Sequence, residues 1–209
     1  MQVTEVNVPG LRPDLLERAR LKEAISALSA EGTAAEDLWQ RGLIFERLGA
    51  LYRLARQPEA AARAFEAALE AHGQLNTPAV TRVYISLGLA LRSAGRPHQA
   101  LAAWERGINL LIDRALKIIY DEGTLLRAAP GKSDRTLLAD TRVFARIREL
   151  CRFDLTFAIL RNNMGVVHTE QGAFQQAVQM FREALDFTPE GARYEHPRDN
   201  LSSLDRQGT

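Results

Sequence analysis

Residues 162–189 read NNMGVVHTEQGAFQQAVQMFREALDFTP, and this stretch decides the fold. It carries an apolar–glycine pair, Met164–Gly165, and a second glycine, Gly172, where a turn would separate two short helices. Small, aromatic and small residues then follow at helical spacing: Ala177, Phe181 and Ala184. Because glycine and alanine let backbones approach closely, the stretch predicts two antiparallel helices, with the aromatic ring filling the space between one pair and the next.

Two earlier segments, starting at Gly42 and Thr81, repeat the pattern. In each, an apolar–glycine pair precedes a bulky residue three positions on, and a small residue follows twelve positions after the glycine. The matching residues are Leu48, Gly49, Tyr52, Ala61, Phe65 and Ala68 in one, and Leu87, Gly88, Leu91, Ala100, Trp104 and Gly107 in the other. A helix pair cannot bury its apolar face alone, so repeated pairs are expected to stack into a solenoid.

The repeated pattern resembles the tetratricopeptide repeat (TPR) family, whose members are right-handed superhelices of helix pairs with a concave groove that binds peptides and proteins. Residues 162–189 match it best, down to the closing Pro189. The departures from the family pattern are Gly73 for a proline, Gly107 for an alanine, Arg161 for an aromatic residue and His168 for a tyrosine. The resemblance covers about half of the chain. It implies an all-α, TPR-like α-solenoid of antiparallel helix pairs, although fold alone does not fix function.

A single TPR-like domain, residues 1–209, is expected. Its parts are an N-terminal extension and capping helix (1–32), repeat one (33–75), repeat two (76–111), a long-helix hairpin insertion (112–157), repeat three (158–189) and a polar tail or capping helix (190–209). Several local signals mark helix ends. They predict helix starts at Pro58, Pro78, Pro97 and Pro197, helix stops at Gly32 and Gly73, and a capping box at Thr33 and Glu36.

The insertion, residues 112–157, keeps apolar residues at helical spacing on both sides of a loop at 128–133. We therefore predict that the helix ending repeat two continues well past its usual end. A second long helix is predicted to run unbroken from Thr136 to Gly165, completing an antiparallel hairpin. A degenerate extra repeat is the alternative. A projecting apolar-striped hairpin would also allow a homodimer, which a monomeric mass at micromolar concentration would contradict.

Composition limits the classes of function. The 209 residues are 46% hydrophobic and carry a net charge of +1, so no global field attracts nucleic acid, and no run of apolar residues is long enough to span a membrane. The one cysteine, Cys151, fits a reducing compartment, and no signal peptide is recognised, so a cytoplasmic location is expected. A regulatory protein that contacts nucleic acid through arginine-bearing helices remains the alternative function.

No residue pattern indicates catalysis, so we expect no enzyme, no cofactor and no metal. The four histidines lack metal-binding spacing, and Gly131–Lys132–Ser133 lacks the first glycine of a phosphate-binding loop. Cys151 falls in an apolar stripe and is predicted to be a buried, inert thiol.

The resemblance implies a set of groove residues, because in the family the first helix of each pair lines the groove. The positions that match carry Arg47, Arg53, Arg82, Ser86, Arg92, Asn162 and Asn163. Arginine binds carboxylates bidentately, and an asparagine amide can hold a peptide backbone. The predicted function is therefore an interaction module or adaptor that binds a partner peptide or protein, an acidic segment in particular. The alternative for each arginine is solvation or pairing with an acid on the adjacent helix.

Overall fold

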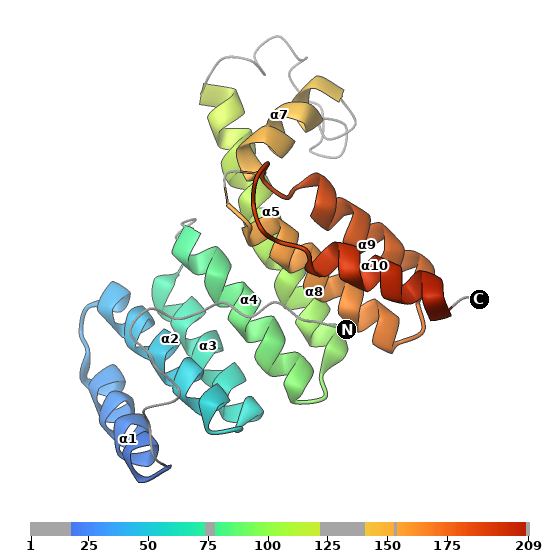
Figure 1. The fold of residues 1–209 in the computed structure, drawn as a ribbon. Coiled ribbons are helices and arrows are strands. Elements are labelled where there is room, and N and C mark those ends of the chain that lie inside the picture. The colour runs from blue at the N-terminus through green and yellow to red at the C-terminus, as the bar shows by residue number, and fades with distance from the viewer. Residues whose placement is uncertain (1–17, 74–77, 122–140, 153, 208–209) are drawn as a thin grey trace. The chain divides into compact units, whose positions relative to one another are not determined.

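The structure is a computed structural model that describes residues 18–73, 78–121, 141–152 and 154–207 (Figure 1). All regular structure in these ranges is helical, which confirms the predicted all-α class. The helices are α1 (Arg18–Ala34), α2 (Leu38–Leu54), α3 (Pro58–His72), α4 (Pro78–Ser93), α5 (Pro97–Asp121), α7 (Thr141–Cys151), α8 (Thr156–Glu170), α9 (Phe174–Asp186) and α10 (His196–Gln207). The chain divides into an N-terminal unit, Glu5–Gly107, and a C-terminal unit that includes Ile108–Thr209, with α5 crossing the boundary.

The pairs α2–α3, α4–α5 and α8–α9 correspond to the three repeats. In each pair, a glycine of the first helix lies directly under an aromatic ring of the second. A Cβ atom added to Gly49 would lie 2.7 Å from the Phe65 ring, and one added to Gly165 would lie 2.5 Å from the Phe181 ring. For Gly88 the corresponding distance, to Nε1 of Trp104, is 2.0 Å. Each ring therefore makes a contact within its own pair that the sequence analysis did not predict.

The same hydrogen-bonded turn joins the two helices of each pair. Its closing bond, from an amide N to a carbonyl O five residues earlier, measures 2.9 Å at Gln57, 2.9 Å at Arg96 and 2.8 Å at Ala173. The turn requires one residue with positive φ, which is Gly95 in the second pair and Gly172 in the third, both at +73°. In the first pair this residue is Arg56, at +57°. A side chain there costs roughly 1 kcal/mol relative to glycine.

The predicted helix starts at Pro58, Pro78 and Pro97 are confirmed, as is the helix stop at Gly73, which has a φ of +59°. The predictions at Gly32, Thr33 and Glu36 are wrong, because α1 continues to Ala34. Gly32 lies against α2, where an added Cβ would be 3.2 Å from Ile44. The Thr33 hydroxyl donates to the carbonyls of Ser29 and Ala30, at 3.2 and 2.8 Å.

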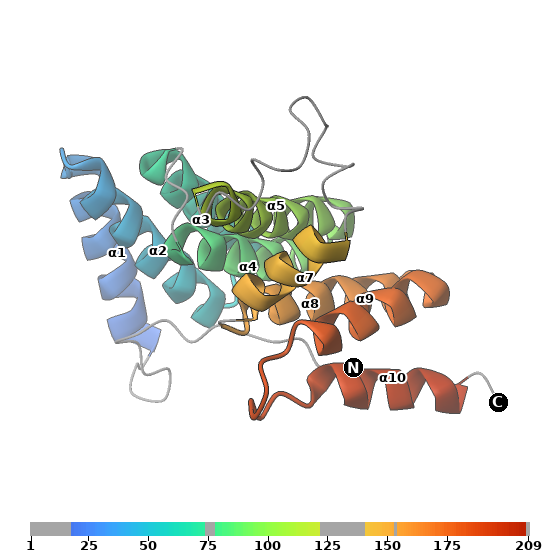
Figure 2. The ribbon, with the colours of Figure 1, turned by 90° about the horizontal axis from the view of Figure 1, so that it is seen from above.

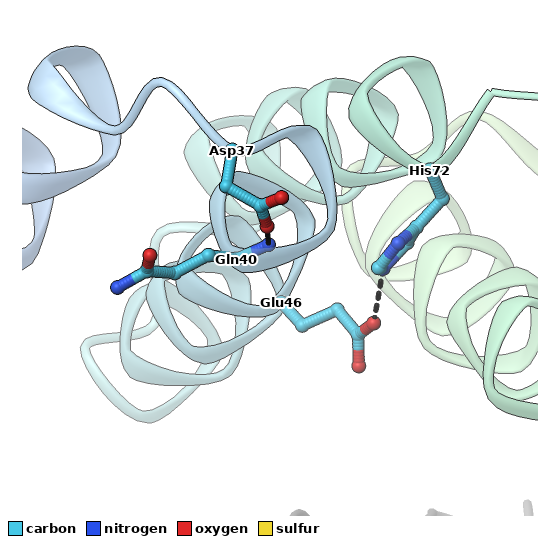
Figure 3. A network of polar contacts seen from close by, with 4 residues as sticks. All are labelled: Asp37, Gln40, Glu46 and His72. Atoms are coloured by element: carbon cyan, nitrogen blue, oxygen red, sulfur yellow. Dashed lines mark hydrogen bonds and ion pairs between the residues drawn. The ribbon is translucent and has the colours of Figure 1, made fainter.

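The N-cap of α2 is therefore Asp37 rather than Thr33. Its carboxylate accepts a 2.6 Å hydrogen bond from the backbone N–H of Gln40 (Figure 3). An aspartate at this position satisfies an amide that the helix itself leaves unpaired.

The helix α5 extends to Asp121, 25 residues in all, as predicted for the start of the insertion. The prediction of a second long, unbroken helix is wrong for the described residues, since α7 ends at Cys151 and α8 begins at Thr156. The Asp154 carboxylate accepts a 2.8 Å hydrogen bond from the Thr156 N–H, which favours a fresh helix start. The predicted loop at 128–133 lies outside the described residues.

Contacts within the C-terminal unit hold α7 against the end of α9. The Phe144 ring of α7 meets Phe187 edge-on at 6.1 Å, and Phe187 stacks on Phe157 at 3.9 Å. The Arg152 guanidinium donates two hydrogen bonds, of 3.2 and 3.1 Å, to the Thr188 carbonyl. Arg161, which departs from the family's aromatic residue, pairs with Glu183 of α9 at 2.8 Å.

The tail, predicted to form a short last helix from Pro197 to Leu204, contains α10. This helix packs on α9 and touches α8 (Figure 2). Leu204 is buried in a cluster with Val166, Ala177 and Phe181, and Leu201 packs against it. The last helix therefore covers apolar surface that the end of a solenoid would otherwise expose.

Candidate partner-binding surface

Five of the seven predicted site residues lie on α2 and α4, two helices of the N-terminal unit that touch each other. Arg47 of α2 and Arg82 of α4 are exposed. Arg53 and Arg92 are half-buried, and each already has an interaction within the chain. Ser86 is buried, so its hydroxyl is not part of the surface. Arg47 and Arg82 are thus the members of this set that stand open to a partner.

The other two predicted residues, Asn162 and Asn163, lie on α8 in the C-terminal unit. Both are fully buried, at 0% exposure. The side-chain oxygen of Asn162, Oδ1, accepts a 2.9 Å hydrogen bond from the side-chain Nδ2 of Asn200 in α10. In this structure the chain's own last helix therefore holds the Asn162 amide.

A polar cluster that the sequence analysis missed lies between α2 and α3 (Figure 3). Nε2 of His72 and Oε1 of Glu46 are 2.7 Å apart, and the His72 side chain has no exposed surface. The Trp39 ring lies 4.7 Å from the imidazole, centroid to centroid. A Cβ added to Gly42 would be 2.4 Å from the His72 ring, which repeats the glycine–aromatic contact two turns away.

The spacing of two glycines and two aromatic rings in the sequence indicates this cluster. Gly42 precedes Gly49 by seven residues, and His72 follows Phe65 by seven, so the two ring–glycine contacts have the same register. Seven residues are about two helical turns. The Glu46 carboxylate, which precedes Arg47 in the sequence, is therefore already bound by His72. At the start of α2, Leu38 and Trp39 are 58% and 40% exposed, which adds apolar area for a partner.

Cys151, at the end of α7, is buried, as predicted. Burial is the main cause that raises the pKa of its thiol, from 9.0 to about 12. The neighbouring Arg114 opposes this increase in the pKa, and Asp154 adds to it. A thiol that stays protonated is a poor nucleophile.

We expect Cys151 to resist thiol reagents until the chain unfolds. The raised pKa makes its thiolate fraction at pH 8 about a thousandfold smaller than that of an unfolded cysteine. Labelling by Ellman's reagent should be at least about a hundredfold slower in buffer than in denaturant. Equal labelling rates in buffer and in denaturant would contradict the prediction that Cys151 is a buried, inert thiol. Because the thiol ionises only in the unfolded chain, it should also make folding stability fall as the pH rises above 9.0.

His168, which stands where the family has a tyrosine, is half-buried, and desolvation lowers the pKa of its imidazole. Among the described residues, no three His, Cys, Asp or Glu side chains come together as metal ligands would. In the same ranges, no helix is both long and apolar enough to cross a membrane. Gly131–Lys132–Ser133 lies outside the described residues.

The family model described as tetratricopeptide repeat matches residues 158–188. Similar solved structures include the crystal structure of MamA, 19% identical, covering 81% of this chain and 90% of that one at a TM-score of 0.37. Another is YrrB, described as a TPR protein with an unusual peptide-binding site. It is 20% identical and covers 90% of this chain and 82% of that one, at a TM-score of 0.34. No curated protein matches the sequence.

Proposed function

We propose that this chain, whose residues 158–188 match the tetratricopeptide repeat model, acts as an adaptor that binds an acidic segment of a partner through α2 and α4. The observation that supports the proposal is the pair of exposed arginines, Arg47 and Arg82, on two helices that touch each other. Guanidinium groups hold carboxylates in bidentate pairs.

The nearby residues support the same surface. Arg53 and Arg92 lie further along α2 and α4, in the last turn of each helix. On α2, the Glu46 carboxylate interacts with His72 and is therefore less available to neutralise Arg47. Steering by such a patch would be salt-dependent. A cytoplasmic location is part of the proposal and rests on the single, unpaired cysteine.

We expect an Arg47→Ala/Arg82→Ala variant to lose the partner. The measurement is affinity capture from native lysate, with quantitative mass spectrometry, of wild type against the variant. Losing two charge-assisted contacts should reduce capture roughly tenfold or more. The matched control is Arg63→Ala/Arg106→Ala, which removes two exposed arginines from α3 and α5. A captured protein that depends equally on both pairs, or on neither, would contradict the proposed surface.

A further inference from the structure

A groove runs along α1 in the N-terminal unit. Two adjoining hollows, of about 710 and 480 Å³, share Lys22, Ile25 and Tyr52 as lining residues. The α1 side of the groove extends from Leu21 to Thr33, about 18 Å of helix. The opposite side is the end of α2 and the turn into α3. An elongated groove of this length accommodates a short helix or an extended segment.

The described residues that line the groove are apolar, polar or basic. Its described apolar lining includes Leu21, Ile25 and Leu54, and its charges are those of Lys22 and Arg56. No acidic residue is among the described residues that line either hollow. Both cations line the larger hollow, so an occupant with apolar side chains and flanking carboxylates would be complementary to it.

Arg56 distinguishes this groove from an ordinary surface depression. It is the turn residue with positive φ, +57°, where the equivalent turns have Gly95 and Gly172. It is also the only non-glycine residue with positive φ in the described ranges. A strained residue held where glycine would relax the backbone indicates that its side chain has a use. The guanidinium at the edge of the groove supplies that use.

We propose that this groove is a second docking site, separate from the arginines of α2 and α4, for an acidic amphipathic segment of another protein. The segment's apolar side chains pack on Ile25, Tyr52 and Leu54. Its carboxylates pair with Lys22 and Arg56. Since the groove is formed by α1, the α2 end and the α2–α3 turn, it belongs entirely to the N-terminal unit.

The test uses the full chain and a fluorescein-labelled synthetic peptide with leucines on one helical face and glutamates elsewhere. Fluorescence anisotropy gives the affinity. We expect binding that weakens with salt and is lost when lysine replaces every glutamate of the peptide. Arg56→Gly should weaken binding roughly tenfold, whereas Arg56→Lys, which keeps the charge, should retain most of it.

The Arg56→Gly variant is informative because glycine is compatible with the positive φ of this turn. Glycine relaxes the positive φ, so the thermal midpoint should stay equal to or above that of wild type. Arg63→Gln, which removes an exposed charge from α3, and Arg47→Ala/Arg82→Ala should both leave the affinity for the peptide unchanged. Equal binding by wild type and Arg56→Gly would overturn the proposal. So would a full chain that binds no peptide, including the case in which its own residues 1–17 fill the groove.

Discussion

Replacing Gly88 with alanine is expected to destabilise the N-terminal unit by about 3 kcal/mol. The new Cβ would lie 2.0 Å from Nε1 of Trp104 and 2.3 Å from Cε2. The indole is fully buried and donates a 3.2 Å hydrogen bond to the Ile85 carbonyl, so it cannot move aside without losing that bond. The higher helix propensity of alanine returns only about 1 kcal/mol.

A double-mutant cycle separates this clash from other effects of the substitution. Unfolding in guanidinium chloride, followed by circular dichroism, gives the free energies. Trp104→Leu alone should cost about 2–4 kcal/mol for the cavity it leaves. In that background, Gly88→Ala should cost little, because the smaller side chain leaves room for a methyl group. If the two costs simply add, the ring–glycine contact is not what holds the pair together.

The second large effect is expected at the last helix. Leu204→Asp places a carboxylate in the cluster of Val166, Ala177 and Phe181, which costs about 3 kcal/mol or more in lost burial and desolvation. We expect α10 to detach and the Asn162–Asn200 hydrogen bond to break with it.

Hydrogen exchange provides the measurement, because amides of a detached α10 lose protection while those of the N-terminal unit do not. Ser202→Asp is the matched control, since Ser202 is exposed on the same helix and receives the same charge. Unchanged protection of α10 in Leu204→Asp would show that Leu204 does not anchor the helix.

Structural features that depend on residues within one helix pair could be predicted from the sequence. The spacing of Gly88 and Trp104 predicts the helix pair, and the prolines at 58, 78 and 97 mark helix starts, because these effects depend on local backbone geometry. Thr33 misled the boundary prediction, since a threonine hydroxyl can cap a new helix or bond back to the previous turn. Gly32 lies against Ile44 of the next helix, a tertiary contact that the local sequence does not reveal.

The candidate site was harder to predict for the same reason. Arg47 and Arg82 are exposed, and their role in binding a partner stays a prediction. Asn162 is buried because a helix more than thirty residues further along the chain covers it, 38 positions away at Asn200. The Glu46–His72 contact likewise joins two helices, 26 positions apart. Such pairings follow from tertiary packing rather than from periodicity.

The docking of α10 also sets a competition. The connection between α9, which ends at Asp186, and α10, which begins at His196, is short. A tethered segment meets its site at an effective concentration in the millimolar range. A free partner that needs the Asn162 amide must therefore compete with a segment that stays attached to the same chain. Occupancy of Asn162 by such a partner would then require a partner concentration, relative to its affinity, that exceeds what the tethered α10 demands.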